Sequence, residues 1–184
     1  MPKYIILFLV SVLFIASSAM AAPLQTGEVF PNIELSGKLT PKQQNYLGLD
    51  AEGPWKLADI DANYIIVEVY SMYCPHCQKE APTVNSLYEE LENSQIGNNM
   101  KLIGLGAGNS EFEIDFFRKK YAVKFPLFSD TELSIHEKVG SPGTPHFFLV
   151  RKDGAKLETI YSHAGRMKKH HDFLIKLKKA TETK

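Results

Sequence analysis

In the middle of the chain, an apolar strand runs directly into a helix that carries both cysteines, and this junction most constrains the fold. Residues 63–70 are β-branched and apolar on both faces, which is typical of a strand inside a sheet. Residues 75–91 carry apolar side chains at three- and four-residue spacing, which predicts a helix. Cys74 and Cys77 lie at the start of that helix. This order of elements indicates an α/β protein with a buried central strand.

The spacing of the two cysteines suits reversible redox chemistry. Two intervening residues allow a small disulfide ring to form and to open again. The free amides and the positive dipole end of a helix favour a thiolate at Cys74, which is the species that attacks disulfides. A purely structural disulfide is a poor alternative, because stabilisation by a cross-link grows with loop length. Covalent haem attachment is excluded, because Gln78 rather than histidine follows Cys77.

Metal binding is a second function class for the same cysteines. Two thiolates supply only half of a closed zinc site, and the chain has no second CxxC motif. A copper-delivery protein would combine the two sulfurs with His146 or His136 as a soft-ligand site. The histidines that could complete a metal site are His76, His136, His146 and His163. Dithiol exchange needs no metal or organic cofactor, and we expect none.

The amino-terminal residues have the features of a secretory signal. Lys3 precedes an apolar run at residues 4–15, and residues 19–21 form a small-x-small cleavage site. We expect cleavage near Ala21, leaving one domain at residues 22–184 in the periplasm or otherwise exported. The apolar run is shorter than the roughly 20 residues of a membrane span, and an uncleaved anchor is the alternative. Disulfide chemistry persists in such compartments.

Charge restricts the partners that the protein can attract at long range. The chain has 21 Lys and Arg residues and 21 Asp and Glu residues, so it presents no overall field to nucleic acid or to an anionic membrane. The basic segment at residues 168–180 is predicted to be the solvated outer side of a closing helix. We therefore expect a monomer that recognises its protein substrates locally.

The rest of the chain alternates strands and helices. We predict strands at 101–105, 146–150 and 156–161, a turn at 153–154, and helices at 111–121, 133–139 and 168–180. The helix at 111–121 is expected to bury Phe112, Phe116 and Phe117. The order predicts a mixed central sheet flanked by helices.

The segment before the central strand is predicted to be irregular. Residues 23–57 are punctuated by proline and glycine. Short strands are expected around residues 33–35 and 46–49. No low-complexity linker or internal repeat interrupts the mature chain, so the lead-in is expected to belong to the same domain.

Motifs along nearly the whole mature chain resemble those of one family. The matching segments are residues 27–35, 55–60, 74–82, 109–130 and 143–154. Within them, Glu80 and Pro82 follow the CxxC pair at the family's spacing, and Thr144-Pro145 matches the loop with the superfamily's cis-proline. The chain resembles the exported TlpA/ResA-like thiol-disulfide oxidoreductases of the thioredoxin superfamily. The resemblance implies a thioredoxin-like fold with the helix-plus-strand insertion of the TlpA/peroxiredoxin branch.

The resemblance and the residue chemistry together assign roles. Cys74 is expected to attack a partner disulfide, and Cys77 to resolve the mixed disulfide from within the helix. Glu68 lies in the apolar central strand, where burial would raise its pKa and let it relay a proton to the second sulfur. Glu68 matches an acidic position of thioredoxin and DsbA. The expected substrate-contacting residues are Tyr73, Thr144 and Pro145, with Pro145 facing the dithiol.

The dipeptide between the cysteines bears on the direction of electron flow. Pro75-His76 resembles the dipeptide of the oxidase DsbA rather than the Pro-Pro or Glu-Pro of TlpA/ResA reductants. His76 is expected to stabilise the Cys74 thiolate. The family implies a reductant of exported protein disulfides that is recharged by a membrane electron carrier, with a DsbA-like oxidant as the alternative. A peroxiredoxin-type peroxidase would need a Pro-x-x-x-Thr-x-x-Cys cradle, which is missing before Cys74.

Overall fold

A mixed five-stranded sheet forms the centre of the molecule. The computed structural model describes residues 22–49 and 52–182. The strand order is β5-β4-β3-β6-β7, with β4 parallel to both β3 and β5 and with β6 antiparallel to both β3 and β7. The strands are β3 (Tyr64–Tyr70), β4 (Met100–Ala107), β5 (Leu127–Asp130), β6 (His146–Asp153) and β7 (Lys156–Ala164). A small antiparallel pair consists of β1 (Glu34–Leu35) and β2 (Trp55–Lys56).

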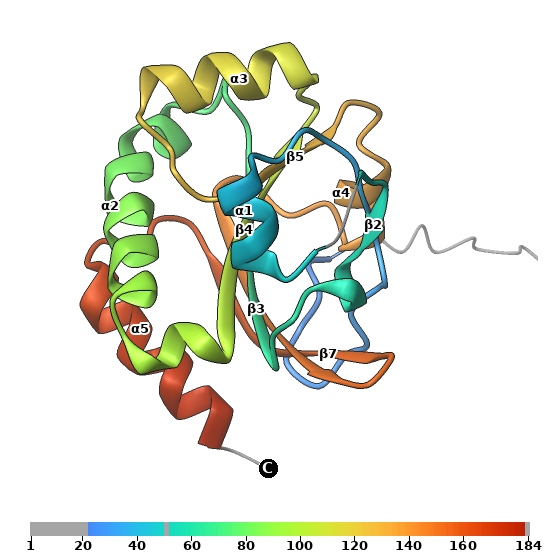
Figure 1. The fold of residues 1–184 in the computed structure, drawn as a ribbon, viewed down its shortest axis with the longest axis vertical. Coiled ribbons are helices and arrows are strands. Elements are labelled where there is room, and N and C mark those ends of the chain that lie inside the picture. The colour runs from blue at the N-terminus through green and yellow to red at the C-terminus, as the bar shows by residue number, and fades with distance from the viewer. Residues whose placement is uncertain (1–21, 50–51, 183–184) are drawn as a thin grey trace, which may run out of the picture.

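Helices cover both faces of this sheet. The helices are α1 (Pro41–Leu47), α2 (Pro75–Glu92), α3 (Glu111–Lys120), α4 (Ser134–Lys138) and α5 (His170–Glu182), with 3₁₀ turns at Leu57–Asp59 and Gln95–Asn98. Figure 1 shows α2 and α5 side by side on one side of the sheet, and α4 with the amino-terminal segment on the other. The predicted α/β fold is thus confirmed, and so is the strand-to-helix junction that carries the cysteines.

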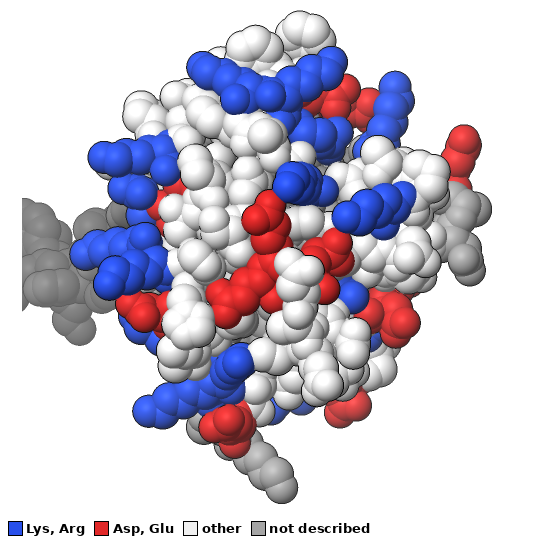
Figure 2. Space-filling view, turned by 60° about the vertical axis from the view of Figure 1, so that its left-hand side comes forward, with Lys and Arg blue, Asp and Glu red and all other residues white. Residues whose placement is uncertain are grey.

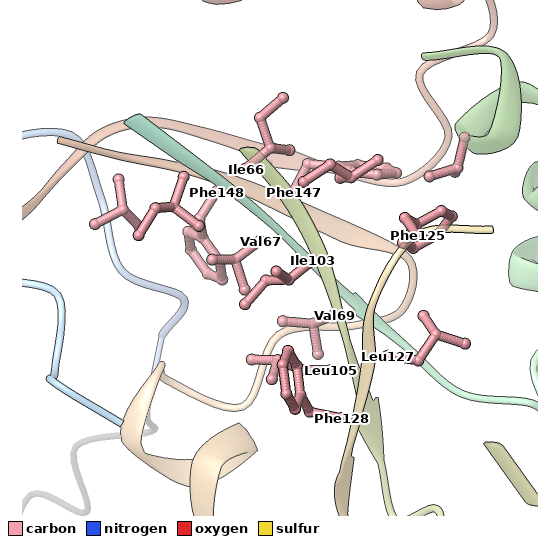
Figure 3. Packing of buried hydrophobic residues seen from close by; sticks show 14 of the residues in the cluster. Ile66, Val67, Val69, Ile103, Leu105, Phe125, Leu127, Phe128, Phe147 and Phe148 are labelled. Carbon is pink, nitrogen blue, oxygen red and sulfur yellow. The ribbon is translucent and has the colours of Figure 1, made fainter. Parts of the chain in front are cut away.

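The central strands supply the core because both of their faces are covered. Val67 and Val69 of β3 lie beside Ile103 and Leu105 of β4 on one face of the sheet, and the buried Ile66 points to the other face, as Figure 3 shows. Burying each such side chain contributes about 1.5–3 kcal/mol relative to leaving it exposed. The short loop between β3 and α2 therefore connects the start of α2 to the end of a fully packed strand.

The segment around residue 46 is a helix, so the expected short strand at 46–49 was wrong. Thr40 is the N-cap of α1, with Pro41 in the first turn and a capping box completed by Gln43. Gly48 ends the helix in the left-handed region, with φ of 66°. The capping residues and the terminal glycine are helix signals. They outweigh the short apolar run that suggested a strand.

Phe112 and Phe116 lie outside the core, contrary to the expectation that α3 buries them. They are 80% and 49% exposed, whereas Ile114 and Phe117 are buried. Successive residues of a helix are about 100° apart, so Phe112 and Phe116 each lie about 200° around the axis from Ile114. The sheet can cover only one of these two faces. The prediction for Phe117 is confirmed.

Several boundaries differ from the expected ones. The hairpin strands β6 and β7 are longer than predicted, and the turn between them lies at residues 154–155, one residue later than the expected 153–154. Helix α5 begins at His170 because Lys168 has a positive φ of 65°. The expected signal segment, residues 1–21, lies outside the described residues. Among the residues that are described, no helix is long and apolar enough to cross a membrane.

The surface carries charges of both signs. On the face shown in Figure 2, acidic side chains lie across the middle and basic side chains lie around them. This distribution agrees with the equal numbers of basic and acidic residues in the sequence. Recognition by this face therefore depends on local groups rather than on one extended field.

Candidate active site

The cysteine pair lies where β3 passes into α2. Cys74 is the N-cap of α2 and has extended backbone angles, and Pro75 occupies the first turn. Proline suits this position, because the first amide of a helix has no intrahelical acceptor. Cys74 is half-buried, whereas Cys77, one turn into the helix, is buried. Only the first sulfur is thus open to a partner.

The loop before β6 approaches the pair from a distant part of the chain. The Cys74 thiol donates a hydrogen bond to the Thr144 carbonyl oxygen, with 3.3 Å between sulfur and oxygen. The Thr144–Pro145 peptide bond is cis. The structure therefore brings Thr144, the residue before Pro145, beside Cys74, in keeping with the family resemblance. The expected contact of Thr144 and Pro145 with an extended substrate stays a prediction.

The two sulfurs have opposite acid–base properties. Partial burial opposes ionisation of Cys74, but hydrogen bonds from the Thr144 side chain and from the amides of Cys77 and His76 outweigh it, so the pKa of Cys74 lies below its usual value. Burial raises the pKa of Cys77 far above its usual value, and the negative charge of Glu68 adds to this effect. These opposite shifts favour Cys74 as the attacking sulfur and Cys77 as the sulfur that requires a base, and both roles stay predictions.

Glu68 lies inside the central strand β3 of the sheet. It is 4% exposed, and its register partners are Gly104 on β4 and Phe147 on β6. Burial raises the pKa of Glu68 to about 8, with a further contribution from the charge of Glu80. A carboxyl group with this pKa exchanges a proton readily near neutral pH. The charge of Glu68 acts on Cys77, and the expected proton relay between them stays a prediction.

Glu80 is a second buried carboxylate that sequence reasoning used only as a motif marker. It is fully buried on α2, one turn after Cys77. Its carboxylate accepts hydrogen bonds from Arg166 Nε at 2.5 Å and from the Met167 amide at 2.8 Å. A buried charge requires such compensation. In the sequence, the three-residue spacing from Cys77 to Glu80 indicated that both lie on one face of the helix. No nearby residue in the sequence identified Arg166 as the partner of Glu80.

Two predicted residues of the motif are exposed. The Tyr73 side chain is 63% exposed, and its hydroxyl donates a hydrogen bond to the Glu113 carboxylate on α3. The His76 side chain is also exposed. The backbone amide of His76 is the part of this residue that lowers the pKa of Cys74. The imidazole role expected from the sequence therefore stays a prediction.

Asn109 is a buried residue that the sequence analysis did not single out as part of the site. Its side-chain oxygen accepts a hydrogen bond from the Met72 amide at 2.9 Å. Met72 lies in the loop between β3 and the motif, so Asn109 links this loop to the start of α3. The signal in the sequence was an asparagine in the short connection between a strand and the Ser110 helix cap.

The histidines expected in a copper site have other partners. His146 Nε2 is 2.9 Å from the Ser162 hydroxyl, and His136 Nε2 is 2.8 Å from the Pro142 carbonyl oxygen. Within residues 22–49 and 52–182, no group of three or more His, Cys, Asp or Glu side chains is arranged to hold a metal ion.

The difference between the two thiols is directly measurable. We expect the pKa of Cys74, measured by thiolate absorbance in a Cys77→Ser variant, to lie below the free-thiol value of about 8.5. The pKa of Cys77 in a Cys74→Ser variant should lie above that value. Thr144→Val should raise the pKa of Cys74, because it removes a hydrogen bond to the thiolate. Equal and unshifted values for the two cysteines would contradict this assignment.

Solved structures with the same fold come from several bacteria. A putative thiol:disulfide interchange protein DsbE from Chlorobium tepidum superposes with a TM-score of 0.66 at 17% identity, covering 85% of this chain and 98% of that one. StoA from Bacillus subtilis superposes with a TM-score of 0.52 at 21% identity, covering 61% of this chain and 81% of that one. These likenesses establish a thioredoxin-like fold.

Sequence relatives identify the chemistry. The thiol-disulfide oxidoreductase ResA of Bacillus thuringiensis (strain Al Hakam) is 29% identical over 162 residues, which cover 87% of this chain and 90% of that protein. ResA of Bacillus subtilis (strain 168) is 22% identical over 105 residues, covering 57% of this chain and 56% of that protein. Fold and site together define a thiol-disulfide oxidoreductase of the thioredoxin-like class. The chain belongs to the AhpC/TSA family, whose model matches residues 26–156.

Proposed function

We propose that Cys74 and Cys77 carry out the thiol-disulfide exchange, and that the protein reduces disulfides of exported proteins. The observation that carries this proposal is the difference in burial between the two sulfurs of one CxxC motif at the start of a helix, with Cys74 accessible beside Thr144 and Cys77 buried. A reactive, half-buried first sulfur and a protected second sulfur are what a two-step exchange requires. The sequence relatives support this chemistry, because they are named thiol-disulfide oxidoreductase ResA.

The exchange proceeds through one mixed disulfide. The Cys74 thiolate attacks one sulfur of the substrate disulfide, forms a new S–S bond and releases the other substrate sulfur as a thiolate. Cys77 then gives its proton to the Glu68 carboxylate, and its thiolate attacks the Cys74 sulfur. The second substrate sulfur leaves, so two electrons pass to the substrate and the pair ends as a disulfide. A membrane electron carrier would return the pair to the dithiol.

Export is part of the same proposal. Residues 1–21 have the pattern of a secretory signal, and residues 22–184 would act outside the cytoplasm after its removal. A solved relative in fold is described as a secreted Mycobacterium tuberculosis disulfide oxidoreductase. Its TM-score is 0.57 at 16% identity, covering 79% of this chain and 94% of that one. An exported dithiol meets substrates whose disulfides persist.

The second candidate function is oxidation of substrate dithiols. The lowered pKa of Cys74 favours it, because stabilising a thiolate stabilises the reduced pair and makes the disulfide more oxidising. Acid trapping of the pair in cells of the native host distinguishes the two functions. A pair found mostly as the dithiol supports the reductant, and a pair found mostly as the disulfide identifies the oxidant.

The His76 backbone amide provides a test of how the potential is tuned. His76→Pro removes this amide, so we expect a higher pKa of Cys74 and a more reducing pair. The shift should amount to tens of millivolts, because about 30 mV corresponds to roughly 1.4 kcal/mol for this couple. His76→Ala keeps the amide and should shift the potential less. Redox titration against glutathione buffers measures both variants, and a larger effect of His76→Ala would assign the tuning to the imidazole instead.

A further inference from the structure

An aromatic surface lies next to the reactive sulfur and is not used by the exchange chemistry itself. Among the described residues, the exposed large hydrophobic side chains are Val29, Tyr73, Phe112, Phe116, Leu133 and Ile175. Three of them, Tyr73, Phe112 and Phe116, line one open groove of about 380 Å³ together with Met72. We call these four residues the aromatic ledge. Tyr73 directly precedes Cys74, so the ledge adjoins the site where a substrate must react.

Hydrogen bonds of the buried Asn109 and of the capping residues of α3 hold the ledge in place. Asn109, which is buried just before α3, accepts a hydrogen bond from the Met72 amide at 2.9 Å. Ser110 caps α3 in a capping box with Glu113. Glu113 also accepts the hydrogen bond from the Tyr73 hydroxyl. The start of α3 is thereby fixed to the loop that carries the motif, so both halves of the ledge keep their relative position.

The face that α3 turns to solvent is set by helix geometry. Phe112 and Phe116 are four residues apart and share one side of the helix, opposite the buried Ile114. Two neighbouring exposed aromatic side chains at one site are a recognised sign of an interaction surface. The other exposed hydrophobic residues, such as Ile175 on α5, do not line this groove.

We propose that the aromatic ledge binds an aromatic or large aliphatic side chain of the substrate polypeptide, located within a few residues of the substrate cysteine. The proposal rests on the proposed function and adds the class of substrate. The aromatic ledge is continuous with the surface around Cys74, and any substrate joined to Cys74 must contact that surface. Glu113 is the only charged residue among those lining the groove, and Tyr73 and Ser110 already donate to it. The groove therefore favours apolar groups and disfavours acidic ones.

The test compares two disulfide-linked peptides that differ at one position. One peptide has phenylalanine two residues from its cysteine, and the other has serine there. We expect the wild-type protein to reduce the phenylalanine peptide with a kcat/KM about tenfold higher. In the double variant Phe112→Ser/Phe116→Ser this ratio should fall to near one. The control variant Ile175→Ser, which changes a residue on α5 about as exposed as Phe116, should keep the wild-type ratio.

The ratio compares two substrates on the same variant, so it does not depend on the overall activity of that variant. Phe112 is 80% exposed, so the single variant Phe112→Ser is expected to fold even if the double variant does not. This single variant should give an intermediate ratio. A ratio near one in the wild type, or an unchanged ratio in the double variant, would overturn the proposal. Dimerisation through the ledge, seen by sedimentation together with equal rates for the two peptides, would overturn it in favour of a second copy as occupant.

A binding experiment separates this proposal from the proposed function. The probes are the same two peptides with serine in place of cysteine, so no exchange can occur. We expect the phenylalanine peptide to shift the NMR signals of Met72 and Tyr73 in the wild-type protein, with a weaker effect in the double variant. If the wild type fails to reduce glutathione disulfide but shows this binding, the reductase proposal fails and the ledge stands. If it reduces glutathione disulfide but binds both peptides equally, the ledge fails alone.

Discussion

A Cys77→Ser variant is expected to accumulate a mixed disulfide with its substrate through Cys74, whereas a Cys74→Ser variant is expected to form none. The reason is the difference in access and acidity, because Cys74 is half-buried with a lowered pKa and Cys77 is buried with a raised one. Multiple-turnover reduction should fall by about 10³-fold or more in both variants, since the two sulfurs act as one unit. Non-reducing electrophoresis and mass spectrometry detect the trapped species.

The assignment of the two roles has a clear counter-outcome. If Cys74→Ser trapped substrate as efficiently as Cys77→Ser, the buried sulfur would be reaching substrate, and the site geometry would be incompatible with the order of steps. Ser71→Ala is a matched control in the loop before the motif, because it changes one side-chain oxygen without touching either sulfur. It should leave no trapped species under the same conditions.

The second large effect concerns the proton of Cys77. Glu68→Gln is expected to slow resolution of the mixed disulfide by about a hundredfold near neutral pH, because general-base assistance typically contributes about 10²–10⁴-fold. The first attack by Cys74 should change little. With a pKa of about 8, the fraction of Glu68 in the carboxylate form rises about tenfold for each unit of pH increase up to that value. The wild-type resolution rate should therefore rise with pH and level off above about pH 8, and the variant should lose this rise.

Rapid-mixing kinetics with a model disulfide resolves the two phases. Glu89→Gln, which removes an exposed carboxylate further along α2, is the matched control and should retain both phases. A Glu68→Gln variant with an unchanged second phase and an unchanged pH profile would show that Cys77 loses its proton by another route.

Stability provides an independent check that Glu68 is buried as described. Its pKa is raised from 4.5 to about 8 by burial first and by Glu80 second, so the folded state binds an additional proton between these values. The free energy of unfolding should then decrease as pH rises through this range, because ionisation is less costly in the unfolded chain. Glu68→Gln should lack this decrease. Denaturant titrations at several pH values measure it.

The buried carboxyl groups of Glu68 and Glu80 interact electrostatically. Glu80 receives hydrogen bonds from Arg166 and from the Met167 amide, so its charge is compensated within the protein. That charge in turn raises the pKa of Glu68. The charge on Glu80 thus increases the affinity of Glu68 for a proton, and the Glu68 carboxylate is the form that accepts this proton from Cys77.

Local patterns in the sequence determined the elements that are built from contiguous residues. The β-branched run at residues 64–70 forms β3, and the spacing of apolar residues predicts α2 with Cys74 at its start. The burial of Glu68 follows from the same run, because a residue inside a strand that is covered on both faces cannot reach water. These features depend on periodicity and on neighbours in the chain, and one sequence contains that information.

Tertiary structure alone decided the contacts between distant segments. The Thr144 carbonyl meets Cys74 across 70 residues, and Arg166 meets Glu80 across 86. The family resemblance pointed to Thr144, whereas no pattern pointed to Arg166. The exposure of Phe112 and Phe116 likewise depends on which face of α3 the sheet covers. A helix period shows which residues share a face, but only the packing of the whole chain decides which face is buried.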